Sequence, residues 1–350
     1  MPISIKFTDE SIERISEHIF LLKSSTNIGI ISLPERRELY LIDSANDDYT
    51  VENIVNFLME KFRGYSIKAV MNTHSHADHC GGNDWLVRTL GCEIWCPEGE
   101  ASLMEYPIIE ADLIWGGTPV HELRSNFLLA KPCKVDYVLK EKFSISTEKL
   151  ESPFESESTE TETEIQIEPV PLPGHYLKPA GFLITDTDGT KSFFLGDAIS
   201  GRNVLKKYWI QYLLDESQSK ESIRKVAETE ADFYIPGHGD MVTEIEGLAE
   251  LNLLAVLETE NLILDTLKTG PKTHEEILKE VADRNGIRLG VSQFFLIGST
   301  IRSYLTGLYE EKRVAFKLVN NQMKWELARK KEEPQKDAPG GSGTEAQLTI

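Results

Sequence analysis

One short segment constrains this chain more than any other. Residues 73–79, with the sequence THSHADH, follow directly after a strand predicted over 66–72. They place His74, His76, Asp78 and His79 within six positions, and such a run on a tight loop can aim two side chains one way and two another. Imidazole and carboxylate groups are the ligands that zinc and iron prefer. The segment therefore predicts a metal-binding loop at the end of a strand.

Three later segments each place a metal-capable side chain just after a strand or in a glycine-flanked turn. His175 lies in the sequence PGH, Asp197 in LGD and His238 in PGHGD. Backbone can approach a site closely at such glycines. Together with 73–79, these segments hold five of the eight histidines of the chain. Each segment alone is weak evidence, but in this order they predict one composite site.

The first 245 residues alternate strand-like and helix-like patterns. Short runs rich in isoleucine, leucine and other apolar residues, bounded by polar or turn residues, predict strands. These strands cover 19–23, 28–33, 39–42, 66–72, 182–187, 191–195 and 231–235, and apolar spacing predicts a helix over 51–62. Strands in such numbers with intervening helices predict an α/β sandwich.

Changes in composition divide the chain into three parts. We expect a catalytic domain over 1–248, a smaller unit over 249–328 and a disordered tail over 329–350. Within the first part, residues 97–168 look inserted. Residues 151–168 carry seven glutamates and no basic residue, which predicts a solvated, mobile loop.

The unit over 249–328 has the pattern of three helices followed by a hairpin. Thr273 and Glu276 have the capping-box spacing at the start of the second helix. This order resembles a winged-helix domain, which often binds DNA through its third helix. That helix offers only Arg302, and residues 250–328 carry 10 basic and 11 acidic side chains. We therefore expect this unit to serve packing or dimerisation, and a homodimer is possible.

Together, the four metal-capable segments resemble the metallo-β-lactamase superfamily over roughly residues 15–245. The resemblance implies an αββα sandwich with a site for two divalent ions along one edge. Zinc is the first expectation, with iron or manganese as alternatives. The implied ligands are His74, His76 and His175 for one ion, Asp78, His79 and His238 for the other, and Asp197 as the bridge. Two such ions would activate a water, and Asp78 or a metal-bound water would shuttle the proton to the leaving group.

The subgroup within the superfamily is less sharply indicated. The spacing from His175 to Asp197 to His238 is similar to that of glyoxalase II, whereas the C-terminal unit looks more like the lactamase-β-2-like branch, some of whose members cut RNA. The turn after His175 departs from the usual pattern, and its Tyr176 and Lys178 are weak substrate-binding candidates. The substrate stays open at this stage.

Charge favours a small substrate. The chain has a net charge of −20, and residues 1–249 carry 42 acidic and 23 basic side chains. Long RNA or an anionic membrane would meet a repulsive surface. No apolar run approaches the roughly 18 residues of a membrane helix, and the first residues lack an apolar signal region, so we expect a cytoplasmic protein.

We therefore predict a dinuclear hydrolase of a small ester, thioester or lactone-like substrate. One alternative is a mononuclear iron persulfide dioxygenase, since those enzymes resemble glyoxalase II. A second is a metal-dependent ribonuclease, supported only by the winged-helix resemblance. A third is a non-catalytic binding protein, but a decayed site would be expected to have lost a ligand, and none is missing.

Overall fold

The computed structural model describes residues 6–148 and 163–328 of the chain. Most of the predicted acidic loop and the whole predicted tail over 329–350 lie outside the described residues.

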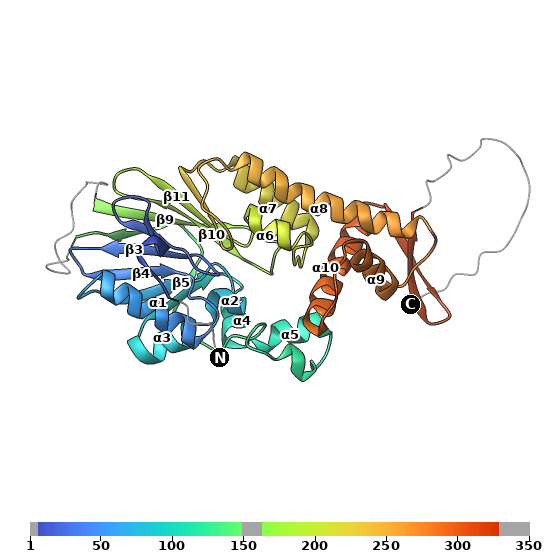
Figure 1. Cartoon of the computed structure of the whole chain (residues 1–350), viewed down its shortest axis with the longest axis horizontal. Coiled ribbons are helices and arrows are strands. Elements are labelled where there is room, and N and C mark those ends of the chain that lie inside the picture. The colour runs from blue at the N-terminus through green and yellow to red at the C-terminus, as the bar shows by residue number, and fades with distance from the viewer. Residues whose placement is uncertain (1–5, 149–162, 329–350) are drawn as a thin grey trace, which may run out of the picture.

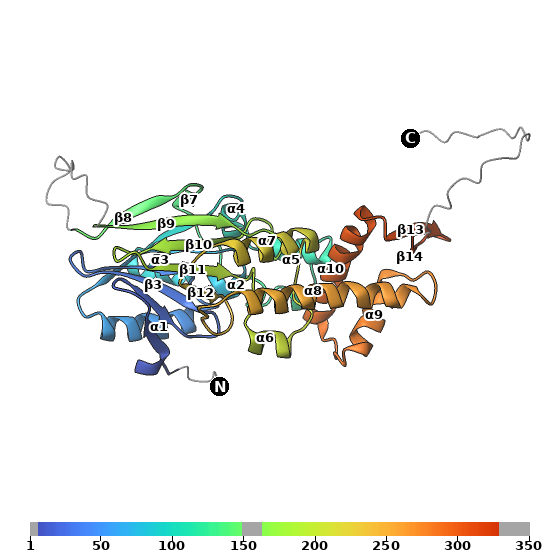
Figure 2. The same cartoon turned by 90° about the horizontal axis from the view of Figure 1, so that it is seen from above.

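Two β-sheets pack face to face, and helices cover the outer face of each (Figures 1 and 2). The first sheet has the order β1 (Ile12–Arg14), β2 (Ile19–Leu22), β3 (Ile28–Leu33), β4 (Glu38–Ile42), β5 (Ser66–Met71), β6 (Glu93–Pro97) and β7 (Tyr137–Leu139). The second has the order β12 (Phe233–Pro236), β11 (Lys191–Gly196), β10 (Ala180–Thr185), β9 (Glu164–Pro171) and β8 (Phe143–Ser146). This arrangement confirms the predicted αββα sandwich.

The central strands are buried on both faces, which explains their continuous apolar sequences. In β3, Ile31 faces the second sheet, whereas Ile30 faces the helical layer formed by α1 (Asp48–Lys61) and α3 (Asn83–Leu90). On the far side of the molecule, α7 (Glu216–Glu228) and α8 (Glu246–Leu267) cover the second sheet. Each sheet therefore buries two apolar faces, and its polar loops collect at the strand ends.

Parallel pairing places several of these ends on one edge of the sandwich. β4 pairs with β5, and β11 pairs with β12, in parallel. The carboxyl ends of parallel neighbours lie together, so the loops that follow β5, β11 and β12 meet at one edge. These are the loops in which the sequence places its histidines and aspartates.

The segment predicted as an insertion contributes to both sheets. β7 is the edge strand of the first sheet, and β8 pairs with β9 at the edge of the second. Between β6 and β7 lie α4 (Ala101–Glu105), α5 (Ile108–Trp115) and a short 3₁₀ helix over His121–Leu123.

The prediction of a loop through residue 168 is wrong for its last five residues, which begin β9. Ile165 and Ile167 point into the core between the sheets. Glu164 and Glu168 alternate with them and stay exposed. A strand with one solvated face accommodates glutamates at every second position, so the high acidic content did not exclude a strand.

The C-terminal elements follow the predicted order. They are α8, α9 (His274–Arg284), α10 (Val291–Glu310) and the hairpin of β13 (Val314–Val319) and β14 (Gln322–Leu327). The capping box at α9 is confirmed, since Thr273 N–H donates to Glu276 Oε2 at 2.7 Å and Glu276 N–H donates to Thr273 Oγ1 at 3.3 Å.

The predicted domain boundary at 248/249 lies inside α8. This helix packs on both α7 and α9, and one apolar cluster runs from the second sheet into α10. The division into two units thus stays a prediction. Across the described residues, every helix is too short or too polar to cross a membrane.

Candidate metal centre

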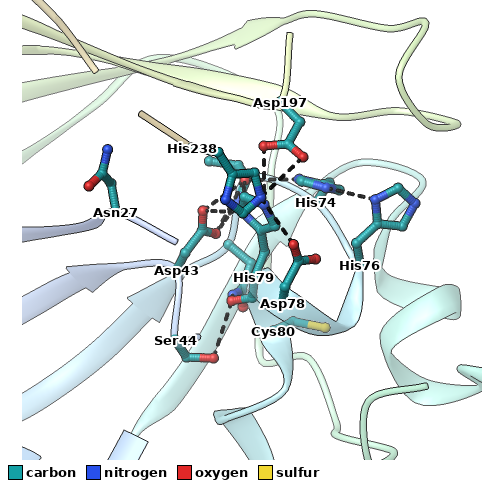
Figure 3. Close-up of polar contacts among 12 residues, drawn as sticks. Asn27, Asp43, Ser44, His74, His76, Asp78, His79, Cys80, Asp197 and His238 are labelled. Carbon is teal, nitrogen blue, oxygen red and sulfur yellow. Dashed lines mark hydrogen bonds and ion pairs between the residues drawn. The ribbon is translucent and has the colours of Figure 1, made fainter. Parts of the chain in front are cut away.

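Four loops at one edge of the sandwich bring the predicted ligand residues together. Figure 3 labels all of these residues except His175. His74 and His76 lie in the loop after β5, which leads into the short helix α2 (Ala77–Cys80) with Asp78 and His79. His175 lies in the turn between β9 and β10. Asp197 directly follows β11, and His238 lies two residues beyond the end of β12. Both sheets therefore contribute to the cluster.

Three imidazole nitrogens converge at one end of the cluster. His76 Nδ1 lies 3.0 Å from His74 Nε2 and 2.9 Å from His175 Nε2. All three side chains are largely buried, so water cannot easily solvate these nitrogens. The group matches the predicted ligand set of the first ion.

A second group lies at the other end and contains Asp78, His79 and His238. His238 Nε2 is 3.0 Å from Asp78 Oδ2. The ligand atoms of this group lie within 4.8 Å of one another, as do those of the three-histidine group. It matches the predicted ligand set of the second ion.

Asp197 lies between the two groups. Its Oδ1 is 3.2 Å from His79 Nε2, and its Oδ2 is 3.4 Å from His175 Nε2 and 3.6 Å from His238 Nε2. One carboxylate therefore faces nitrogens of both groups, which is the position predicted for the bridge.

Hydrogen bonds on the far side of each ring determine which nitrogen faces the centre. His175 Nδ1 is 3.0 Å from the Tyr212 carbonyl oxygen, and His238 Nδ1 is 2.7 Å from the Ser25 carbonyl oxygen. A carbonyl only accepts, so each Nδ1 carries a proton, and in its neutral form each ring directs the lone pair of Nε2 inward. Outer partners of this kind orient metal-binding histidines.

Asp43 orients His79 in the same way and was missed by the sequence analysis. It follows β4, and its Oδ2 accepts from His79 Nδ1 at 2.7 Å. The same carboxylate accepts from the Thr73 backbone N–H at 2.8 Å and from Thr73 Oγ1 at 2.9 Å. Because that hydroxyl donates to Asp43, its oxygen accepts from His74 Nδ1, 3.0 Å away. The sequence did carry a signal for Asp43: like Asp197, it is a polar residue directly after a buried strand.

The pKa values separate the two ends of the cluster. Burial is the largest influence on the three-histidine group: it lowers the pKa of His74 and of His175, and it lowers that of His76 to about 3. At the other end burial also lowers the pKa of the histidines, but nearby carboxylates raise it by more. Asp197 and Asp43 raise the pKa of His79, and Asp197 and Asp78 raise that of His238 to about 9.

The donor set fits two divalent cations. His79 Nε2 and Asp197 Oδ1 are buried and make no hydrogen bond within the described part of the chain. With its Nδ1 proton directed to Asp43, a neutral His79 would turn a lone pair toward the Asp197 carboxylate. Two acceptors facing each other in a buried site need a proton or a cation between them. Nitrogen and carboxylate ligands in this mixture suit zinc, iron or manganese.

Two buried glutamates border the cluster, and neither was predicted. Glu100 accepts from the Ser75 N–H at 3.0 Å and the Lys178 N–H at 2.8 Å, so it ties the 73–79 loop to the turn after His175. Glu110 of α5 lies with its Oε1 3.6 Å from His76 Nε2. No periodic pattern marked either residue, because both lie in the turn-rich segment over 97–145.

The two weak substrate-binding candidates, Tyr176 and Lys178, differ in exposure. The side chain of Tyr176 is buried, with its ring 4.3 Å from that of His76, whereas Lys178 is exposed. Trp115 is partly exposed and packs on Phe295 of α10 at a ring distance of 4.8 Å. It therefore belongs to the contact between α5 and α10.

Comparison with known proteins identifies the family. The family model described as the metallo-beta-lactamase superfamily matches residues 56–238, which is more than half of the chain. The chain belongs to this superfamily. The match includes all seven predicted ligand residues.

This chain matches its curated relatives only over short segments. The metallo-beta-lactamase type 2 of Pseudomonas aeruginosa is 32% identical over 87 residues, which are 22% of this chain and 34% of that protein. A hydroxyacylglutathione hydrolase of Thiobacillus denitrificans is 47% identical over 36 residues, which are 10% of this chain and 14% of that protein. The chain thus spans about a third or less of the length of these relatives.

Two solved structures share the fold over most of the chain. A beta-lactamase domain protein from Burkholderia ambifaria has a TM-score of 0.67 and 14% identity, and the match covers 93% of this chain and 97% of that one. A metallo-beta-lactamase family protein from Thermus thermophilus has a TM-score of 0.65 and 16% identity, with 91% and 99% covered. At such identities the likeness concerns the superfamily fold alone.

Proposed function

We propose that this protein is a dinuclear metal hydrolase, with zinc as the native metal and a small ester, thioester or lactone-like compound as substrate. The observation that supports it best is the placement of Asp197 between two separate ligand groups. Members of the superfamily are generally hydrolytic metalloenzymes, and this chain retains every residue of the predicted ligand set.

Two bound ions would supply an activated water and positive charge for the oxygen that gains charge during hydrolysis. The residues around them would hold this arrangement rigid: Asp43 and the carbonyls of Ser25 and Tyr212 fix three of the imidazoles. Asp78 has a further role in this proposal. Its side chain is 43% exposed, whereas that of Asp197 is 13% exposed. Asp78 is therefore the carboxylate that solvent and a leaving group can reach to exchange a proton.

A small substrate is favoured by the charge of the chain. Acidic residues outnumber basic ones by 57 to 37, and two divalent ions offset only a small part of that excess. A long polyanion would be repelled by this surface, whereas a small ester or thioester carries little charge into the site.

The first test is the metal content of the purified protein, measured by mass spectrometry. We expect about two zinc ions per chain in the wild type, and fewer in Asp197→Ala and His238→Ala, because each variant loses a ligand. Asp240→Ala, an exposed carboxylate in the same turn as His238, is the matched control and should keep both ions.

A screen of thioesters, lactones, esters and phosphodiesters follows with the same proteins. We expect both ligand variants to lose more than about 100-fold in rate, the upper end for loss of an outer partner. About one iron per chain, retained in His238→Ala, would overturn the proposal and favour the persulfide dioxygenase, tested by oxygen uptake on glutathione persulfide.

A further inference from the structure

A buried carboxylate outside the sandwich lies against the metal centre. Glu110 is 7% exposed and belongs to α5, in the segment between β6 and β7. Its Oε1 is 3.6 Å from Nε2 of His76. A buried carboxylate is costly unless a partner compensates it, so its position beside a predicted ligand requires an explanation.

His76 is distinctive among the five histidines of the centre. The other four each have a hydrogen-bond partner on the ring nitrogen that faces away from the centre: Thr73 Oγ1, Asp43, and the carbonyls of Tyr212 and Ser25. His76 is turned the other way, with Nδ1 inward and Nε2 outward. That Nε2 is buried and makes no hydrogen bond to the residues that the structure describes.

We infer that Glu110 is the positioning residue for His76, accepting a hydrogen bond from its Nε2–H when Nδ1 binds a metal ion. The inference rests on the proposed metal centre. Among the outward nitrogens of the centre, only that of His76 lacks a partner within hydrogen-bond distance in the described part of the chain, and a small closure of the 3.6 Å gap would supply one. The pair then has the carboxylate–histidine–metal geometry by which proteins orient such ligands.

The surroundings hold Glu110 in place. Ala111 and Ile114 of α5 form an apolar cluster with Phe295 and Leu296 of α10, and Trp115 packs on Phe295. On the other side, the ring of Tyr176 packs against that of His76. A partner on a packed helix positions a ligand more rigidly than one on a free loop. The orientation of His76 therefore depends on how α5 docks against the C-terminal helix α10.

A pair of variants of similar size tests this role without using catalysis. Glu110→Gln keeps an oxygen that accepts a hydrogen bond, and Glu110→Met removes it. Each metal-free protein would be titrated with Co²⁺ in competition with a chelator, and the visible absorption spectrum of bound cobalt would be recorded. Glu216→Gln is the control, because Glu216 is also buried but contacts Lys220 and lies outside the metal centre.

We expect Glu110→Met to bind one of its two cobalt ions about 10- to 100-fold more weakly, with an altered spectrum, since His76 belongs to one ligand group only. Glu110→Gln should stay within about threefold of the wild type, because its hydrogen bond differs only in charge. The control should keep wild-type affinity and spectrum.

Equal cobalt affinities and spectra for the Met and Gln variants would overturn the inference. A wild type that binds cobalt normally in that experiment would leave the proposed metal centre standing. A wild type that binds no cobalt would instead overturn the metal centre itself, and the role of Glu110 with it.

Discussion

Two buried polar clusters in this molecule are built in opposite ways. One joins α7, α8 and the residue just before β13. There Lys220 Nζ is 2.6 Å from Glu216 Oε1 and 3.4 Å from Glu260 Oε2, and Arg313 also pairs with Glu260. Each charge in this cluster faces the opposite charge. The other cluster is the metal centre, where imidazole nitrogens face one another and the carboxylate of Asp197.

The difference indicates whether the buried groups of a cluster can pair with one another. Buried polar groups that are fully paired add specificity to packing, whereas buried acceptors that face acceptors are unfavourable until a cation or proton lies between them. The cluster around Lys220 is complete without a ligand and holds the C-terminal helices on the sandwich. The acceptors of the metal centre need a proton or a cation between them.

The largest expected effect concerns the paired cluster. Lys220→Met should lower the free energy of unfolding by about 3–5 kcal/mol, because Glu216 would stay buried without its cation and Glu260 would keep only Arg313. Urea unfolding measures this loss, and exposed Lys206→Met in α6 (Arg202–Lys207) is the control. Zinc content should not change. A variant that loses zinc instead of stability would break the distinction between the clusters.

A smaller effect is expected at the outer shell of the metal centre. Asp43→Asn should weaken zinc binding by about 10- to 100-fold, because an amide cannot accept on both sides as the carboxylate does from Thr73 and His79. Asparagine tolerates the positive φ of 64° at this position, so backbone strain is not the cause. Competition with a chelator measures the affinity.

The chain offers a closely matched control for that variant. Asp186 is also buried, and its two oxygens accept from His18 Nδ1 at 2.8 Å and from Ser16 Oγ at 2.6 Å. Asp186→Asn should lose stability as Asp43→Asn does, yet keep zinc affinity. If both variants lose zinc equally, the effect comes from general loosening of the sandwich.

The last effect is graded with pH and needs no substitution. In the metal-free protein burial opposes the charge on His238, but Asp197 and Asp78 raise its pKa to about 9. Zinc must displace that proton, and also the proton of His79, whose pKa is raised as well, so zinc affinity should fall by at least about tenfold for each pH unit below 9. Chelator competition at pH 7, 8 and 9 measures this slope. A flat profile would contradict the protonated state of His238.

The same pKa fixes the direction of a stability change. A histidine whose pKa is raised by folding stabilises the metal-free protein fully below about pH 6.5, and this contribution is lost as the pH rises toward 9. Urea unfolding of metal-free protein should show that decline, and it should be weaker in His238→Gln.

Local patterns predicted the strands that lead into the metal centre and the C-terminal elements, but not α3, α5, α7, β6 and β7. Two of the differences have local causes. The helix predicted over 51–62 begins three residues earlier, at Asp48, because Asp47 caps it by accepting from the Thr50 N–H at 2.7 Å. The strand that begins at Glu164 was missed because overall acidity outweighed the alternation of Ile165 and Ile167. In both cases a short-range signal was present in the sequence.

The sequence by itself determined which side chains follow which strands, since strand ends and glycine turns are set by short-range backbone preferences. Only the tertiary structure decided how they meet. The two sheets bring His76 to 2.9 Å from His175, 99 positions away, and the packing of α5 brings Glu110 behind His76. Such contacts depend on how distant apolar faces pack together, which no local pattern specifies.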